Sequence, residues 1–81
     1  MTVTVYTRAG CHLCEEAERV VRAEQPAAGF DLELVDIDGD PELARRYGVR
    51  VPVVAVDGEE LFEYEVPPDL LRARLGRVRA D

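Results

Sequence analysis

The chemistry of this chain centres on its two cysteines, Cys11 and Cys14, which are separated by two residues. They follow a β-branched run over residues 2–7 and precede a helix-patterned stretch over residues 15–25. A Cys-x-x-Cys pair where a strand turns into a helix is typical of thiol–disulfide exchange. Unpaired backbone N–H groups and the positive end of the helix dipole stabilise a thiolate there. We therefore interpret Cys11 as a redox nucleophile and Cys14, within the first helical turn, as the resolving thiol.

His12 directly follows the first cysteine. As an imidazolium it would stabilise the Cys11 thiolate and make the disulfide more oxidising. As a solvent-facing spacer it would merely fill the first variable position of the motif. The residues by themselves leave both roles open.

Two other functions are compatible with the same cysteines. Together with His12 they offer at most three soft ligands, whereas a closed zinc site needs four. Metal or iron–sulfur binding would therefore require a second chain or glutathione to complete the site. Asp36, Asp38 and Asp40 are explained better by a loop with a helix cap than by a cation site, so we expect no metal. A non-catalytic binding module is the other possibility, and the presence of both cysteines argues against it.

The size and charge of the chain exclude several classes of function. Its 81 residues form one small domain, 1–81, with a net charge of −7 that argues against nucleic acid and anionic membranes as partners. All basic residues are arginine, which excludes catalysis through a lysine amine. The N-terminus lacks the features of a signal peptide, and no apolar run approaches membrane-spanning length. We therefore expect a cytoplasmic protein, in which a close cysteine pair is more often catalytic or metal-binding than structural.

Hydrophobic periodicity and turn residues predict an α/β domain with the element order βαβαββα. The predicted strands cover residues 2–7, 30–37, 51–56 and 59–64, and the predicted helices cover residues 12–25, 41–47 and a stretch that opens at 67–69. Val3 and Val5 should share one face of the first strand, and Pro26 and Gly29 should end the first helix. Apolar stripes are expected on the first helix (Leu13, Ala17, Val20, Val21) and on the last (Leu71, Leu75, Val78).

Three segments resemble the glutaredoxin branch of the thioredoxin superfamily. Residues 5–14, Val-Tyr-Thr-Arg-Ala-Gly-Cys-His-Leu-Cys, are similar to the glutaredoxin strand and active-site loop. Residues 47–52, Tyr-Gly-Val-Arg-Val-Pro, resemble the segment that carries the superfamily's cis-proline, and the hairpin and terminal helix that follow also match. The resemblance covers essentially the whole chain and is closest to the short group with Cys-His-Leu-Cys. It implies the thioredoxin/glutaredoxin fold, a four-stranded mixed sheet flanked by helices, and a thiol–disulfide oxidoreductase activity.

The resemblance also implies substrate-binding roles for three residues. Pro52 should follow a cis Val51–Pro52 bond, which would place the N–H and C=O of Val51 beside Cys11, free to pair with a substrate strand. An ordinary trans proline at a strand start is the alternative. Arg8 lies where many glutaredoxins carry lysine, and it could attract a thiolate or a substrate carboxylate. A solvated surface arginine is the alternative for that position.

The chain departs from the family at the glutathione site. Glutathione-dependent glutaredoxins usually carry Gly-Gly and then Asp-Asp after the last strand, whereas Phe62 and Glu63 stand in place of the glycines here. Bulky side chains block close backbone approach, and Glu59, Glu60, Glu63 and Glu65 place negative charge near an anionic tripeptide. We therefore expect no cofactor, with glutathione disfavoured. The expected partners are a protein or small-thiol disulfide as substrate and a thiol donor or a reductase as the source of electrons.

Overall fold

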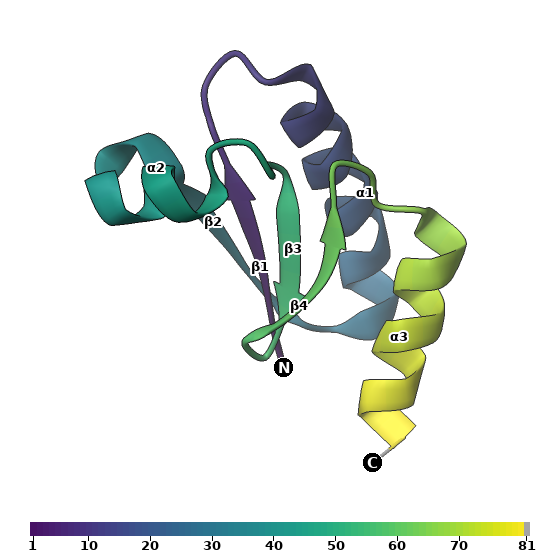
Figure 1. Ribbon diagram of the computed structural model, residues 1–81. Coiled ribbons are helices and arrows are strands. Elements are labelled where there is room, and N and C mark those ends of the chain that lie inside the picture. The colour runs from purple at the N-terminus through teal and green to yellow at the C-terminus, as the bar shows by residue number, and fades with distance from the viewer. Residues whose placement is uncertain (81) are drawn as a thin grey trace.

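The computed structural model describes residues 1–80, with side chains described for residues 1–76 (Figure 1). Its strands are β1 (Thr2–Thr7), β2 (Asp31–Asp36), β3 (Val53–Val56) and β4 (Glu59–Glu63). Its helices are α1 (His12–Ala28), α2 (Pro41–Tyr47), α3 (Pro68–Ala80) and a short 3-10 helix, η1 (Ile37–Gly39). The predicted order βαβαββα is confirmed, with η1 as an addition between β2 and α2. None of the described helices is long and apolar enough to cross a membrane.

The strands form one mixed sheet of four strands in the order β2-β1-β3-β4, as the family resemblance implies. β1 is parallel to β2 and antiparallel to β3, and β3 is antiparallel to β4. Tyr6 pairs with Val53, and Val53 pairs with Glu63, so these residues form one row across the sheet. The β1–α1, α2–β3 and β4–α3 connections therefore lie at the same end of the sheet, at the top of Figure 1.

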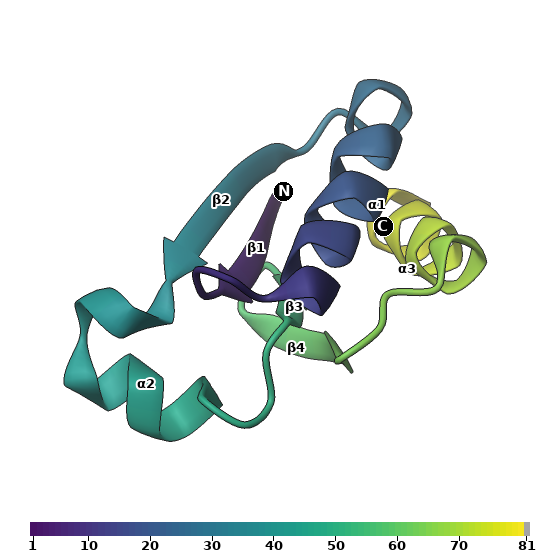
Figure 2. The same ribbon diagram turned by 90° about the horizontal axis from the view of Figure 1, so that it is seen from above.

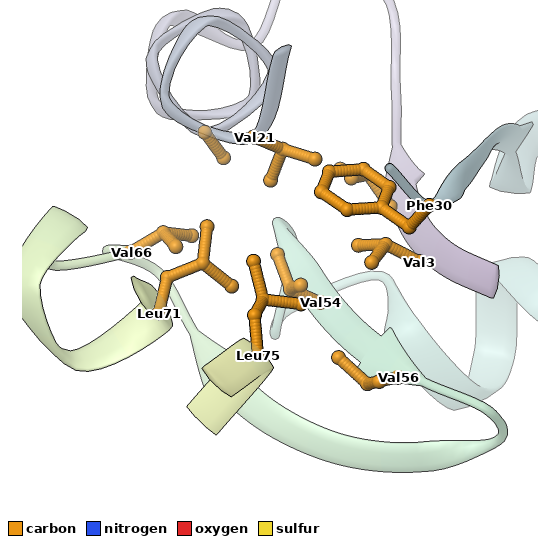
Figure 3. Close-up of a cluster of buried hydrophobic side chains, with 10 residues drawn as sticks. Val3, Val21, Phe30, Val54, Val56, Val66, Leu71 and Leu75 are labelled. Carbon is orange, nitrogen blue, oxygen red and sulfur yellow. The ribbon is translucent and has the colours of Figure 1, made fainter. Parts of the chain in front are cut away.

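The main core lies between the sheet and two helices. α1 and α3 cover one face of the sheet, and α2 lies on the other (Figure 2). Val3 and Val5 are fully buried toward α1 and α3, as the alternation in β1 predicts. The other buried members are Ala17, Val21, Phe30, Val54, Val56, Val66, Leu71 and Leu75 (Figure 3). Val78, the third residue of the predicted α3 stripe, lies outside the described side chains.

A second, smaller apolar cluster lies on the α2 side of the sheet. Its buried members are Ile37, Tyr47 and Val53, and the ring of Tyr6 stacks on Tyr47 with 4.2 Å between ring centres. Tyr47 is the last residue of α2. The cluster therefore anchors the start of the connection that carries Pro52 to the end of the sheet.

Helix α1 is longer than the sequence predicts. It continues through Pro26 to Ala28 and is capped by Gly29, whose φ is +71° and whose N–H donates to the Gln25 carbonyl at 2.7 Å. Pro26 lies in the last turn, where its missing N–H removes one helical hydrogen bond without preventing the final residues from staying helical. The expectation that Pro26 helps to end the helix is therefore wrong, whereas Gly29 does end it.

Strand β3 is shorter than predicted, because it begins at Val53 and leaves Val51 and Pro52 in the preceding connection. The N–H of Val51 donates to the Tyr47 carbonyl at 3.1 Å. The backbone there continues the turn that follows α2 and does not pair with β1. This turn brings the connection back over the end of the sheet.

Candidate active site

Cys11 and Cys14 form a disulfide at the N-terminus of α1, with their Cα atoms 5.2 Å apart. Cys11 is the N-cap residue of the helix, with extended backbone angles (φ −98°, ψ 109°). Gly10 turns the chain into this position with a φ of +73°, a conformation that a residue without a Cβ adopts readily. The predicted setting of the cysteine pair between a strand and a helix is confirmed.

The two cysteines differ in exposure. Cys14 is 1% exposed, whereas Cys11 is partly exposed. The backbone N–H of Cys14 donates to the Sγ of Cys11 at 3.1 Å, so a donor of the helix N-terminus points at the outer sulfur. In the reduced protein such a donor and the helix dipole favour the thiolate of Cys11. This geometry suits an attack by Cys11 on an external disulfide, followed by an attack of Cys14 on Cys11.

His12 is the first residue of α1, and its side chain is 80% exposed. Its Nδ1 lies 4.0 Å from a carboxylate oxygen of Glu15, and its Nε2 lies 3.6 Å from one of Glu16. An imidazolium at this place would therefore have two carboxylates as neighbours. This high exposure fits the alternative in which His12 is a solvent-facing spacer of the motif. An effect of His12 on the Cys11 thiolate stays a prediction.

Arg8 is engaged within the chain. Its Nε and Nη2 donate to the Asp38 carboxylate at 3.3 and 2.7 Å, and its Nη1 donates to the Gly48 carbonyl at 3.0 Å. The hydrogen bond from this guanidinium holds the pKa of Asp38 below its usual range. Arg8 thus fastens the β1–α1 connection to η1 and to the end of α2. Its cation is already paired, which weakens the hypothesis that it attracts a substrate carboxylate, and the sequence reasoning missed this fastening role.

The acidic residues at the end of β2 and before α2 have local structural roles. The Asp36 carboxylate accepts a hydrogen bond from the N–H of Asp38 at 2.9 Å, and Asp40 caps α2 by accepting one from the N–H of Glu42 at 2.9 Å. The prediction of a loop with a helix cap is confirmed. Among the side chains that the structure describes, no group of three or more His, Cys, Asp or Glu residues is arranged to hold a metal ion.

The Val51–Pro52 peptide bond is cis, as the family resemblance implies. The N–H of Val51, however, donates to the Tyr47 carbonyl at 3.1 Å, so the expectation that it is free to pair with a substrate strand is wrong. The Pro52 carbonyl accepts a hydrogen bond from the N–H of Tyr64 at 2.9 Å. The Val51 carbonyl accepts none from the described part of the chain, so it is the group of Val51 that a substrate could still use.

A polar network holds the turn before Pro52 against β4. The hydroxyl of Tyr47 donates to Glu60 at 2.8 Å, and Arg50 donates to Glu60 at 2.6 Å and to Glu63 at 3.0 Å. Burial, and then the hydrogen bond to Glu60, raise the pKa of Tyr47 to about 12. The hydrogen bonds from Arg50, and then from Tyr47, lower the pKa of Glu60. The network therefore ties the α2–β3 connection to the sheet, and no local sequence signal indicates it.

A groove of about 520 Å³ lies beside the cysteine pair, between the first turns of α1 and residues 64–68. Leu13, between the two cysteines, lines this groove and is 43% exposed. The prediction that Leu13 belongs to the core-facing stripe of α1 is therefore wrong, because the first turn of α1 extends beyond the end of the sheet (Figure 1). Tyr64 lines the groove from the β4–α3 connection and is 48% exposed. Sequence reasoning missed the groove, because its walls come from distant segments.

Tyr64 adopts a backbone conformation that favours glycine. Its φ is +66°, and the N–H of Glu65 donates to the Glu63 carbonyl at 2.7 Å, which makes a γ-turn of the rare, strained kind. This position directly follows Phe62 and Glu63, which replace the family's glycine pair. The backbone conformation at position 64 therefore favours glycine, yet the residue there is a tyrosine whose side chain lines the groove.

We expect the Tyr64→Gly protein to be more stable than the Tyr64→Ala protein, although both lose the ring. A left-handed backbone costs a residue with a Cβ about 1–2 kcal/mol, and glycine escapes most of that cost. Urea unfolding of the two variants would measure the difference in the free energy of unfolding. An alanine variant that is equally or more stable would contradict the positive φ at this position.

The fold and the site together define a class of protein. A parallel β1–α1–β2 unit followed by an antiparallel β3–β4 pair and a closing helix is the thioredoxin fold, in which a Cys-x-x-Cys pair begins α1 and a cis-proline precedes β3. The chain matches the glutaredoxin-like domain family (DUF836) over residues 2–76, and it belongs to that family.

Relatives support the same assignment. The uncharacterized protein Rv0508 of Mycobacterium tuberculosis is 36% identical over 80 residues, which cover 93% of this chain and 82% of the relative. Among solved structures, protein Ne2328 from Nitrosomonas europaea is 40% identical, with a TM-score of 0.74 over 90% of this chain and 88% of that one. The NrdH-redoxin of Escherichia coli, described as a glutaredoxin-like protein with a thioredoxin-like activity profile, is 27% identical, with a TM-score of 0.62 over 90% of this chain and 93% of that one.

Proposed function

We propose that the protein is a thiol–disulfide oxidoreductase, with Cys11 as the nucleophile and Cys14 as the resolving thiol. The observation that carries the proposal is the asymmetry of the pair. The Sγ of Cys11 receives an N–H of the helix N-terminus at 3.1 Å and belongs to a partly exposed residue, whereas Cys14 is buried within disulfide-bonding reach of it. An exposed, stabilised thiolate beside a shielded partner thiol is the arrangement that two-step exchange requires.

The exchange proceeds in two balanced steps. The Cys11 thiolate attacks one sulfur of the substrate disulfide, the substrate S–S bond breaks, and the released thiolate takes a proton from solvent. The Cys14 thiolate then attacks the Cys11 sulfur, forms the Cys11–Cys14 disulfide and releases the second substrate thiol. Two electrons pass from the cysteine pair to the substrate, and an external dithiol or a reductase must reduce the pair again.

The proposed source of electrons is a reductase of the kind that serves thioredoxins, and not glutathione. Phe62 and Glu63 stand in place of the family's glycine pair, the Tyr64 ring that follows them lines the groove, and Glu65 adds a negative charge beside it. An anionic tripeptide would meet both obstacles. The likeness to NrdH-redoxin, whose activity profile is described as thioredoxin-like, supports the same choice. A reducing compartment such as the cytoplasm suits this role.

The test is an assay of disulfide reduction in insulin with dithiothreitol as the reductant. We expect the wild-type protein to accelerate the reaction and the Cys11→Ser variant to leave it at the uncatalysed rate. Equal rates for the two proteins would contradict the proposed function. Recycling of the oxidised protein by thioredoxin reductase should be faster than by reduced glutathione, and fast turnover with glutathione alone would overturn the proposed donor.

A further inference from the structure

The groove beside the disulfide has an apolar floor. It lies between the first turns of α1 and residues 64–68. Val20 of α1 and Pro67 line it together with the exposed side chains of Leu13 and Tyr64. Leu13 lies between the two cysteines in the chain, so the groove begins directly beside the cysteine pair. Such a surface suits an apolar side chain close to the substrate cysteine.

The polar lining of the groove is acidic. Glu16 and Glu65 both line it, and the only other titratable side chains among its lining residues are those of His12 and Tyr64. The carboxylate of Glu65 has no ion-pair partner among the side chains that the structure describes. Glu16 has the Arg19 guanidinium at 3.3 Å and the His12 imidazole at 3.6 Å, and both contacts are largely exposed to solvent and therefore weak.

Among the described side chains, Arg19 is the one arginine that pairs with a carboxylate of this groove. The others pair with carboxylates elsewhere, namely Arg8, Arg22, Arg45, Arg46, Arg50, Arg72 and Arg74. The net charge of −7 adds a long-range field of the same sign. The groove therefore presents negative charge that its occupant must complement.

We propose that the groove binds a cationic peptide segment of a protein substrate. An apolar side chain beside the substrate cysteine would pack on Leu13 and Tyr64, and a basic side chain of the same segment would pair with Glu16 and Glu65. The inference rests on the proposed function, because it names the substrates that the cysteine pair reduces. Opposite charges on the groove and the peptide speed their association. Like charges on the groove and an acidic peptide repel each other and exclude that peptide as a partner.

The test compares two synthetic peptides, each supplied as its symmetrical disulfide. One carries Arg-Phe-Cys-Arg at its centre and the other carries Glu-Phe-Cys-Glu, and hydroxyethyl disulfide serves as a small uncharged substrate. We expect the wild-type protein to reduce the basic peptide with a kcat/KM at least about fivefold higher than the acidic one, the factor that corresponds to one good exposed ion pair. This preference should shrink at high salt.

Matched variants locate the source of the preference. Glu16→Gln with Glu65→Gln should bring the ratio of the two kcat/KM values close to one. The control, Asp31→Asn with Glu33→Gln, removes the same charge from exposed residues of β2 and should keep the wild-type ratio. A ratio within one protein is independent of how much of that protein is active.

The outcomes separate the two proposals. A wild-type ratio near one, or a ratio that survives Glu16→Gln with Glu65→Gln, would overturn the inference, and turnover of the peptides would at the same time support the proposed function. If none of the three disulfides is reduced, the proposed function fails and the inference fails with it.

Discussion

The Cys14→Ser protein is expected to stop halfway through exchange and to accumulate a mixed disulfide between Cys11 and the substrate. The first attack needs the partly exposed Cys11 thiolate, which this substitution leaves in place. The second attack is intramolecular in the wild-type protein, where the two Cα atoms lie 5.2 Å apart. Well-oriented intramolecular reactions reach effective concentrations of about 10⁵ M or more, far above any thiol in solution. Without Cys14, release of the substrate therefore becomes the slow step.

Mass spectrometry of the non-reduced protein after mixing with the basic peptide disulfide would detect this adduct. The Cys11→Ser protein is the matched control and should form almost none, because Cys14 is 1% exposed. Cys14→Ala provides a second variant, because it avoids the cost of burying the serine hydroxyl without a hydrogen-bond partner. An adduct that forms as fast on Cys14 in the control would reverse the two roles. A Cys14→Ser protein that turns over at the wild-type rate would show monothiol chemistry.

The Leu71→Ala protein is expected to lose about 2–5 kcal/mol of its free energy of unfolding. The substitution removes apolar atoms whose burial stabilises the folded state, and it leaves a cavity in their place. Leu71 is fully buried in α3, within the cluster that includes Val3 and Val21 (Figure 3). A domain of this length has about 4–12 kcal/mol of stability in total. The substitution therefore removes a large share of it, and α3 depends on this packing since an isolated helix of its length is marginal in water.

Urea unfolding followed by circular dichroism would measure the loss. Leu70→Ala is the control, because the neighbouring leucine is 56% exposed and its loss should change the free energy of unfolding by about 0.5 kcal/mol or less. Similar losses for the two variants would show that α3 is not docked on the sheet through Leu71. A small loss for both would show that the domain does not need α3 for its stability.

Most of the fold could be predicted because its signals are local. The alternation of Val3 and Val5, the cap and proline at Asp40 and Pro41, and the turn after α1 at Gly29 each depend on neighbouring residues. The errors occur at the ends of elements, where several signals compete. Pro26 was expected to help end α1, but tertiary packing and the Gly29 cap extend the helix past it.

The site was predicted in part. The Cys11–Cys14 pair at the start of α1 and the cis bond before Pro52 are confirmed. The expected role of the Val51 N–H fails, because the Tyr47 carbonyl already accepts its hydrogen bond. Arg8 serves Asp38 and Gly48, partners 30 and 40 positions away, which no local pattern reveals.

The sequence by itself determined the reactive pair, because a Cys-x-x-Cys between a strand and a helix is set by consecutive residues. The tertiary structure alone decided what surrounds that pair. Leu13 and Tyr64 face a common groove since the sheet register brings the β1–α1 and β4–α3 connections to one end, and the same register leaves Glu16 and Glu65 beside them. Contacts between distant segments depend on the strand register and on the packing of α1. No local stretch of residues determines either of them.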